Sequence, residues 1–405
     1  MNVQIESISG GGVTSPSGFS AGVTAAGIKH AAGTRFDLGI LYSDTPSVAA
    51  ALFTRNRIKA APLVLSQERV HSGRISAVIV NSGCANACTG ERGIKDAEEM
   101  AALAARLVGV TPESVVVAST GVIGVPLPMD RIRAVTGKIT LSPEGGHDFA
   151  RAIMTTDTVP KEIAVSVKCG DSSFKIGGVA KGSGMLHPDM ATMLCFLTTD
   201  AAVEKGFLQK ALQEAADSSL NMVSVDGDSS TNDTVVLLAN GRAGNTEIKR
   251  GSKMAGAFRQ ALLQVCIYLT RCLARDGEGA SKLIEVTVNG AGSVKEARQA
   301  ARTVVSSNLL KAAVYGNDPN WGRVLAALGR SGVEIEEAKI DLYFDSISVM
   351  KAGRPLSFDT EKVVAVLKRS EVPININLNI GSAQATAWGC DLTEEYVKIN
   401  AEYTT

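Results

Sequence analysis

The chain has 405 residues, 45% of them hydrophobic, which is enough for a large core divided over two or three domain-sized units. Its 41 basic and 41 acidic residues balance and aromatic residues make up only 4%, so neither a positive field nor stacking platforms favour nucleic-acid binding. No run of about 18 apolar residues occurs, so we expect neither a membrane span nor a membrane partner.

The N-terminal segment and the cysteines indicate the compartment. Residues 1–19 lack a basic stretch followed by an apolar one, so no secretory signal is expected. The seven cysteines are scattered without a CxxC pair, which is typical of buried thiols in a reducing compartment. Cys84 and Cys88 form a CxxxC pair with no histidine near them in the sequence, so buried thiols are favoured over a metal site there. We therefore expect a cytoplasmic protein.

In chain order, the first half alternates short apolar runs with amphipathic stretches. Residues 74–83 (RISAVIVNSG) and 113–121 (ESVVVASTG) predict buried strands that end in small residues. Between them, residues 93–109 predict a helix that closes on a glycine. Residues 161–180 alternate in polarity and predict a hairpin that turns at Gly170–Asp171.

The second half continues this alternation. After the apolar segment 190–200 (MATMLCFLTTD), helices are predicted near 204–219 and 253–275, with a strand at 234–240 between them. Residues 282–314 predict a strand, a turn and one long helix, and the chain then ends in strands and a polar tail. The overall prediction is a mixed α/β or α+β fold of layered helices and sheets, without a sharp domain boundary.

Several familiar motifs can be excluded. The segment KGSGML (181–186) has neither the residue order of a phosphate loop nor the third glycine of a dinucleotide fingerprint. The segment 225–233 begins like a calcium loop, but Thr231 and Leu237 occupy the positions of the required glycine and glutamate. No GxSxG elbow occurs, and the four histidines have no triad context. His187, which precedes a proline, is interpreted as a loop or capping residue.

Thr192 is the candidate nucleophile because it follows the small residue Ala191 inside the apolar segment. Its hydroxyl could attack the carbonyl of Ala191, form an ester by an N-to-O acyl shift, and leave a new N-terminal threonine after hydrolysis. The α-amine of that threonine has an unperturbed pKa of about 8 and can accept the hydroxyl proton, so such a site works without histidine. The alternative from these residues alone is a threonine in a buried strand.

Eight ordered blocks give the sequence a resemblance to a known family: VNSGCANACTG (80–90), STGVIG (119–124), IMTTDT (153–158), GGVAKGSGMLHPDMATML (177–194), SVDGDSSTNDT (224–234), ARDGEGASKL (274–283), YGNDPNWGR (315–323) and INAEYTT (399–405). With them the chain resembles the ornithine acetyltransferase family, the glutamate N-acetyltransferases of arginine biosynthesis, almost from end to end. The resemblance implies a layered αββα-type sandwich like that of the aminopeptidases and ornithine acetyltransferases. It also implies self-cleavage between Ala191 and Thr192 into an α chain (1–191) and a β chain (192–405) that share one core.

The resemblance further implies the reaction and its partners. N-acetylornithine would acetylate Thr192 and release ornithine, and glutamate would then take the acetyl group and leave as N-acetylglutamate. This ping-pong exchange needs neither a metal nor a nucleotide cofactor. Acetyl-CoA as a second donor and an α₂β₂ heterotetramer are further expectations, and the sequence does not separate members that use acetyl-CoA from those that do not.

By the same resemblance, roles are assigned to further residues of this chain. Thr120 and Gly121 match the family's oxyanion pair, for which a hydroxyl and a glycine N–H are suitable donors. Lys181 matches a substrate-binding lysine that would meet a carboxylate, and Glu278 matches a glutamate that would meet the ornithine ammonium. Asp276 stays unassigned, either a neighbour of Glu278 or a turn residue.

The remaining substrate contacts lie in one threonine-rich loop and at the C-terminus. Thr155 is assigned a contact, with Thr156 as its close competitor. Asn400 and Thr405 match the family's two terminal contacts. A terminal tail is otherwise expected to fray, so this assignment predicts that the tail folds back over the pocket.

Two other classes remain open. A self-processing amidohydrolase or aminopeptidase would share Thr192 but pass the acyl group to water. A non-enzymatic α/β protein would keep Thr192 as a core strand residue, and its chain would stay whole.

Overall fold

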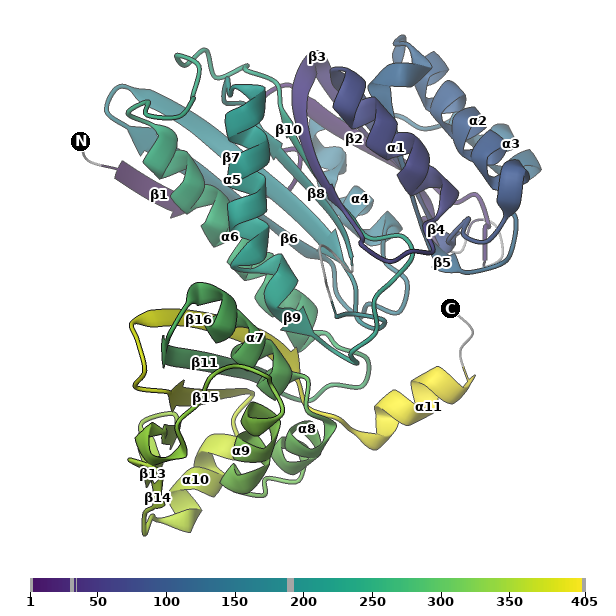
Figure 1. The fold of residues 1–405 in the computed structure, drawn as a ribbon. Coiled ribbons are helices and arrows are strands. Elements are labelled where there is room, and N and C mark those ends of the chain that lie inside the picture. Colours follow the sequence, from purple (N-terminus) through teal and green to yellow (C-terminus); the bar gives the residue numbers. More distant parts are fainter. Residues whose placement is uncertain (1–2, 30–32, 34, 188–192, 403–405) are drawn as a thin grey trace.

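The structure is a computed structural model that describes residues 3–29, 33, 35–187 and 193–402. The chain forms two lobes, the first built on a nine-stranded sheet and the second on a seven-stranded sheet (Figure 1). Within the described ranges, no helix has both the length and the apolar character needed to cross a membrane.

The first sheet bends along its longest strand, β3 (Leu38–Phe53), which belongs to both of its halves. The strand order is β1-β6-β7-β8-β10-β3-β4-β5, and β2 also pairs with β3. The start of β3 pairs with β2 and β4, whereas its end pairs with β10. The other strands are β1 (Val3–Ser7), β2 (Phe19–Thr24), β4 (Ile75–Cys84), β5 (Val115–Val122), β6 (Lys161–Cys169), β7 (Ser172–Lys181), β8 (Leu194–Thr199) and β10 (Thr234–Ala239).

An apolar core fills the space between the two halves of this sheet. Phe196 of β8 packs edge-on against Phe149 of α4 (Gly146–Ala152), with ring centroids 5.7 Å apart. Because side chains alternate across a strand, Val78 of β4 faces this inner core while its neighbour Ile79 faces the outer helices. Because both faces of such a strand are buried, its sequence contains a continuous apolar run, as in β4.

Helices cover the outer faces of both halves, as Figure 1 shows. On one side lie α5 (Lys205–Asp217) and α6 (Ala255–Arg275), and on the other lie α2 (Gly90–Val108) and α3 (Met129–Thr136). The order of layers is helix, sheet, sheet, helix, which confirms the predicted αββα sandwich. The helix α1 (Ala61–Ser72) packs along β5, where the hydroxyl of Ser66 bonds to both backbone groups of Val117.

The second lobe is an open sheet with helices, in the strand order β14-β13-β12-β15-β11-β16-β9. Its strands are β9 (Val223–Ser224), β11 (Leu283–Ala291), β12 (Asp341–Phe344), β13 (Ile347–Lys351), β14 (Arg354–Pro355), β15 (Glu371–Asn377) and β16 (Ala383–Cys390). Its helices are α7 (Val294–Val305), α8 (Asn308–Tyr315), α9 (Trp321–Gly329) and α10 (Thr360–Leu367). The last helix, α11 (Glu394–Glu402), leaves this lobe and runs back toward the first one (Figure 1).

Most of the predicted elements are confirmed to within a few residues. The hairpin at 161–180 is β6 and β7, and the helices near 204–219 and 253–275 are α5 and α6. The prediction of one long helix within 282–314 is wrong, because the chain breaks into α7 and α8. The side chain of Ser307 accepts a hydrogen bond from the N–H of Leu310 and begins a new helix there.

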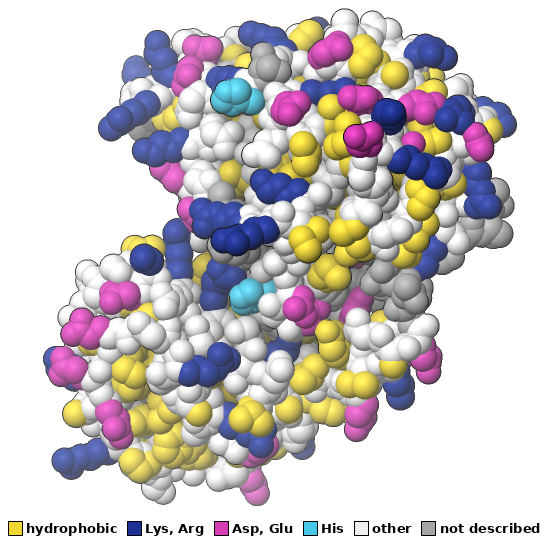
Figure 2. Space-filling model, turned by 45° about the vertical axis from the view of Figure 1, so that its right-hand side comes forward, with side chains coloured by type: hydrophobic (Ala, Val, Ile, Leu, Met, Phe, Trp, Pro, Cys, Tyr) yellow, Lys and Arg dark blue, Asp and Glu magenta, His cyan; other side chains and the backbone are white. Residues whose placement is uncertain are grey.

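The surface charges agree with the balanced composition, and the expectation of buried thiols is confirmed for five of the seven cysteines but is wrong for the exposed Cys88. Acidic and basic side chains are intermixed over most of the face shown in Figure 2, and basic ones gather where the two lobes meet. All seven cysteines are free thiols. Cys84 is buried and its thiol bonds to the carbonyl of Val125, whereas Cys88 is exposed, so the CxxxC spacing does not produce a pair of neighbouring buried thiols.

Candidate active site

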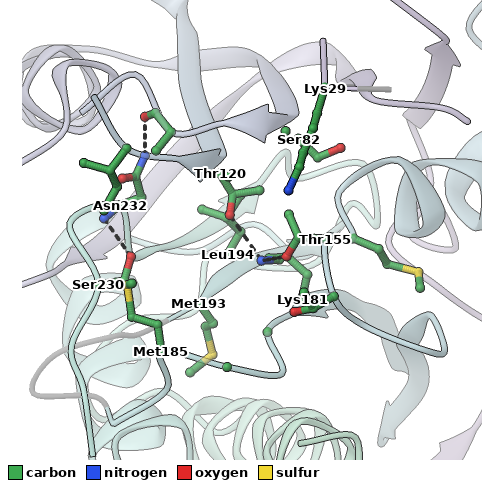
Figure 3. Close-up of a pocket in the computed structure, with 18 of the residues that line it drawn as sticks. Lys29, Ser82, Thr120, Thr155, Lys181, Met185, Met193, Leu194, Ser230 and Asn232 are labelled. Carbon is green, nitrogen blue, oxygen red and sulfur yellow. Dashed lines mark hydrogen bonds between the residues drawn. The ribbon is translucent and has the colours of Figure 1, made fainter. Parts of the chain in front are cut away.

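A cavity lies where the ends of several strands of the first sheet meet, and it encloses about 1000 Å³ of space, part of it open to solvent. The register places Lys181 of β7, Leu194 of β8 and Thr234 of β10 side by side in one row. Figure 3 shows side chains of this region converging. Of the residues assigned from the sequence, the cavity is lined by Thr120, Gly121, Thr155, Lys181, Glu278 and Asn400.

Three assigned residues, Ala191, Thr192 and Thr405, lie outside the described residues. Met193 directly follows Thr192 in the chain and lines the cavity. The carbonyl of Met193 accepts a hydrogen bond from the N–H of Thr234 at 2.8 Å, which fixes the beginning of β8 against β10. Met193, the first described residue after the expected cleavage point, therefore lies at this cavity.

Lys181 extends from the inner face of β7 into the cavity. Its ammonium donates hydrogen bonds to the hydroxyls of Thr155 at 2.7 Å and Thr120 at 3.2 Å (Figure 3). The residue is only 8% exposed, and burial lowers the pKa of Lys181, an effect that the nearby carboxylate of Asp157 opposes. A substrate carboxylate in the cavity would stabilise the charged form of this side chain.

Thr120 and Gly121 end β5 on the opposite side of the inner core. Because Lys181 donates to the hydroxyl oxygen of Thr120, the proton of that hydroxyl is directed to another acceptor, as an oxyanion donor requires. Gly121 has a φ of +132°, and a Cβ there would lie 2.3 Å from the carbonyl carbon of Gly83 in β4. Only glycine allows this close approach of the two strands at the edge of the cavity.

The two competing threonines of the 153–158 segment have different partners. Thr155 accepts the bond from Lys181, whereas the hydroxyl of Thr156 bonds to that of Ser183 at 2.7 Å. Both residues line the cavity, so the structure brings both to the site. Because Thr155 contacts Lys181 directly, its side chain is favoured over that of Thr156 to contact a ligand bound by Lys181.

Glu278 and Asn400 form the side of the cavity that comes from the C-terminal half. The amide of Asn400 on α11 donates to the carboxylate of Glu278 at 2.8 Å. The N–H of Glu278 in turn donates to the carbonyl of Ser183 at 2.8 Å, and a Cβ on Gly184 would lie 2.4 Å from the Glu278 carboxylate. The structure therefore brings the C-terminal tail to the cavity as far as Asn400.

A buried ionic triad holds the cavity wall in place. The ammonium of Lys161 lies 2.6 Å from a carboxylate oxygen of Asp157 and 2.5 Å from one of Asp276. Asp157 also accepts the backbone N–H groups of Thr155 at 3.0 Å and Gly182 at 2.7 Å. Burial alone would raise the pKa of Asp157, but the ammonium groups of Lys161 and Lys181 hold it well below its usual range. Asp276, left unassigned above, is therefore a member of this triad.

The sequence reasoning missed a second group of cavity residues on the loop before β10. The amide of Asn232 donates to the carbonyls of Ala85 at 2.6 Å and Ser119 at 2.8 Å, which joins this loop to β4 and β5. Asp233 is 2% exposed, and one of its carboxylate oxygens has no hydrogen-bond partner among the described residues. Burial raises the pKa of Asp233 well above its usual range, partly offset by Ser230. The block 224–234 was noted as a motif, but nothing in it indicated these roles.

The ring of His187 lies between the hydroxyl of Ser224 at 2.9 Å and the guanidinium of Arg302 at 3.1 Å. Because a guanidinium can only donate, Nε2 accepts and Nδ1 carries the proton in this arrangement. Among the residues that the structure describes, three or more His, Cys, Asp or Glu side chains nowhere come together in an arrangement that could hold a metal ion.

Comparisons with known proteins give a consistent result. The sequence profile of the ArgJ family matches residues 20–405. The arginine biosynthesis bifunctional protein ArgJ of Symbiobacterium thermophilum is 54% identical over 98% of this chain and 99% of its own length, and that of Dehalococcoides mccartyi is 50% identical over the full length of both. The crystal structure of the protein of that name from Bacillus halodurans is similar with a TM-score of 0.50 and 44% identity, covering 51% of this chain and 97% of the solved chain.

The buried triad predicts a large effect for Lys161→Met. The substitution leaves two buried carboxylates without their cation, so the free energy of unfolding should fall by about 3–5 kcal/mol, measured by denaturant titration. Lys168→Met, on the exposed side of the same strand, is the matched control and should change it little. Equal unfolding midpoints for the two variants would contradict the stabilising role of the triad.

Proposed function

The chain belongs to the ArgJ family, and on that premise we propose that it is an acyltransferase of arginine biosynthesis that moves an acetyl group from N-acetylornithine to glutamate. The observation that carries the proposal is the meeting of Lys181, Thr120 and Thr155 beside the first residues of β8. The exchange requires a nucleophile that accepts the acetyl group, for which Thr192 is proposed. It also requires an oxyanion donor, here Thr120, and a cation that binds the substrate carboxylate, here Lys181.

The nucleophile is generated by the chain itself. The hydroxyl of Thr192 attacks the carbonyl of Ala191, and hydrolysis of the resulting ester leaves an α chain of residues 1–191 and a β chain of residues 192–405. Because β8 lies between β7 of the first chain and β10 of the second, the two products remain joined by one sheet. The solved Bacillus halodurans chain matches over 97% of its own length but covers only 51% of this chain. A solved chain of about half this length supports a cut near the middle.

Acetyl transfer then proceeds in two steps. The α-amine of Thr192 takes the hydroxyl proton, the oxygen attacks the acetyl carbonyl of N-acetylornithine, and the amine proton leaves with ornithine. The α-amino group of glutamate reverses these steps and releases N-acetylglutamate. Thr120 and the N–H of Gly121 stabilise the oxyanion of each intermediate.

Substrate binding is assigned to the charged residues of the cavity. Lys181, with Thr155 beside it, binds the carboxylate that both amino-acid substrates carry, and Glu278 meets the side-chain ammonium of ornithine. Asn400 orients Glu278. Thr405, outside the described residues, is assigned a further substrate contact. The reaction uses no metal or nucleotide cofactor, and acetyl-CoA enters as a second donor, in line with the bifunctional proteins that the chain resembles. The cytoplasmic location and the α₂β₂ assembly remain predictions.

Self-cleavage is tested first by the intact mass of the denatured protein. The two products, of 191 and 214 residues, should have masses of roughly 20 and 22 kDa of the 42.2 kDa total. Thr192→Ala removes the attacking hydroxyl and should stay whole. An uncut wild-type chain in an active preparation would exclude Thr192 as the nucleophile. In the same preparation, ornithine release that does not depend on glutamate would favour the hydrolase over the transferase.

Oxyanion stabilisation is tested at Thr120. Thr120→Ala removes one donor, so kcat of the exchange from N-acetylornithine to glutamate should fall by about 10²–10³. Thr120→Ser keeps the hydroxyl and should retain most of the activity. If both variants lose activity to the same extent, the hydroxyl of Thr120 is not the group that stabilises the oxyanion.

The role of the C-terminal helix is tested at Asn400. Asn400→Ala removes a charge-assisted hydrogen bond to Glu278, so kcat/KM for N-acetylornithine should fall by roughly tenfold to a hundredfold. Lys398→Ala, an exposed change on the same helix that breaks only the ion pair with Glu395, is the control. Unchanged kinetics for Asn400→Ala would show that α11 takes no part in binding.

A further inference from the structure

A second cavity adjoins the first and shares two lining residues with it, Arg35 and Met154. It encloses about 980 Å³ of space, part of it open to solvent. Arg151 of α4 and Thr158 line the second cavity but not the first. The two cavities therefore form adjoining spaces that meet at Arg35 and Met154.

The second cavity has a positive lining. The guanidinium of Arg35 donates to the backbone carbonyl of Thr155 at 3.2 Å, and the hydroxyl of the same threonine accepts a hydrogen bond from Lys181. Arg151 pairs with Asp148 at 3.0 Å, and both side chains are about half exposed, so the pair is open to competition from another anion. The carboxylate of Asp157 also lines the cavity, but it is held by the buried ammonium of Lys161.

Apolar groups lie next to these arginines. Phe36 lines the cavity and is 39% exposed, and Val159, between the lining residues Thr158 and Pro160, is 51% exposed. A lining of arginines with apolar side chains suits a ligand that carries phosphate groups on a partly apolar arm. N-acetylornithine and glutamate carry neither phosphates nor such an arm.

We propose that the second cavity binds the phosphorylated arm of acetyl-CoA, with Arg151 as its phosphate contact, while the acetyl group reaches the first cavity past Met154. This inference rests on the proposed function. In the step it serves, the oxygen of Thr192 forms a bond to the acetyl carbon and the C–S bond breaks. The hydroxyl proton passes through the α-amine to the leaving thiolate, which departs as CoA thiol.

The test compares two donors that differ in their phosphates. With glutamate as acceptor, Arg151→Gln should raise the KM for acetyl-CoA by about tenfold or more, because a guanidinium–phosphate contact is among the stronger hydrogen bonds. The KM for S-acetylpantetheine, which lacks the phosphates, and that for N-acetylornithine should stay unchanged. Arg151→Lys keeps the charge and should restore part of the acetyl-CoA affinity. Arg354→Gln, an exposed arginine of the second lobe, is the control.

Each result has a defined meaning. An unchanged KM for acetyl-CoA in Arg151→Gln, or equal losses with acetyl-CoA and S-acetylpantetheine, would overturn the assignment of a phosphate contact. A wild-type enzyme that exchanges acetyl groups between ornithine and glutamate but does not use acetyl-CoA would overturn this inference and leave the proposed transferase intact. A wild-type enzyme without exchange activity would instead overturn the proposed function itself.

Discussion

The ammonium of Lys161, buried between Asp157 and Asp276, is the interaction on which the geometry of the site depends. The side chain of Lys161 is only 1% exposed, so its charge is tolerated only while both carboxylates remain in contact. That requirement brings together the start of β6, the loop at 155–158 and the end of α6. The same carboxylate of Asp157 then holds the backbone of Thr155 and Gly182, which flank the side chain of Lys181.

The position of β8 explains how one chain could be cut beside this site and still hold its structure. Hydrogen bonds join β8 to β7 on one side and to β10 on the other, and its side chains enter the apolar cores on both faces of the sheet. These hydrogen bonds and apolar contacts do not require the peptide bond between Ala191 and Thr192, so the core between the layers can persist after that bond is cut. The site lies at the strand ends, where the backbone leaves the sheet and side chains from both layers can approach one another.

Several residues in the sequence blocks that carried the family resemblance have a structural role in the folded chain. In the block 315–323, Asn317 adopts a positive φ and its side chain accepts from the ammonium of Lys282, which also binds the carbonyl of Val314 at the end of α8. Gly184 leaves room for the carboxylate of Glu278, and Gly121 allows β5 to approach β4. Glycine at positions 121 and 184 is therefore a condition for the close packing around the cavity.

The sequence by itself determined the alternation of strands and helices, because apolar periodicity and glycine positions are local properties of the chain. Its ordered motifs, through the family resemblance that they carry, indicated the sandwich class and most of the candidate residues. It did not indicate the break between α7 and α8, where a single serine cap outweighs the helical pattern on both sides. Nor did it indicate the partnership of Lys161 with Asp276, the buried carboxyl of Asp233 or the second cavity. These features join segments that are far apart in the chain, as Lys161 and Asp276 are separated by 115 positions. Only the tertiary structure decides which distant charges are buried together, because the cost of burial depends on the surroundings that the folded chain provides.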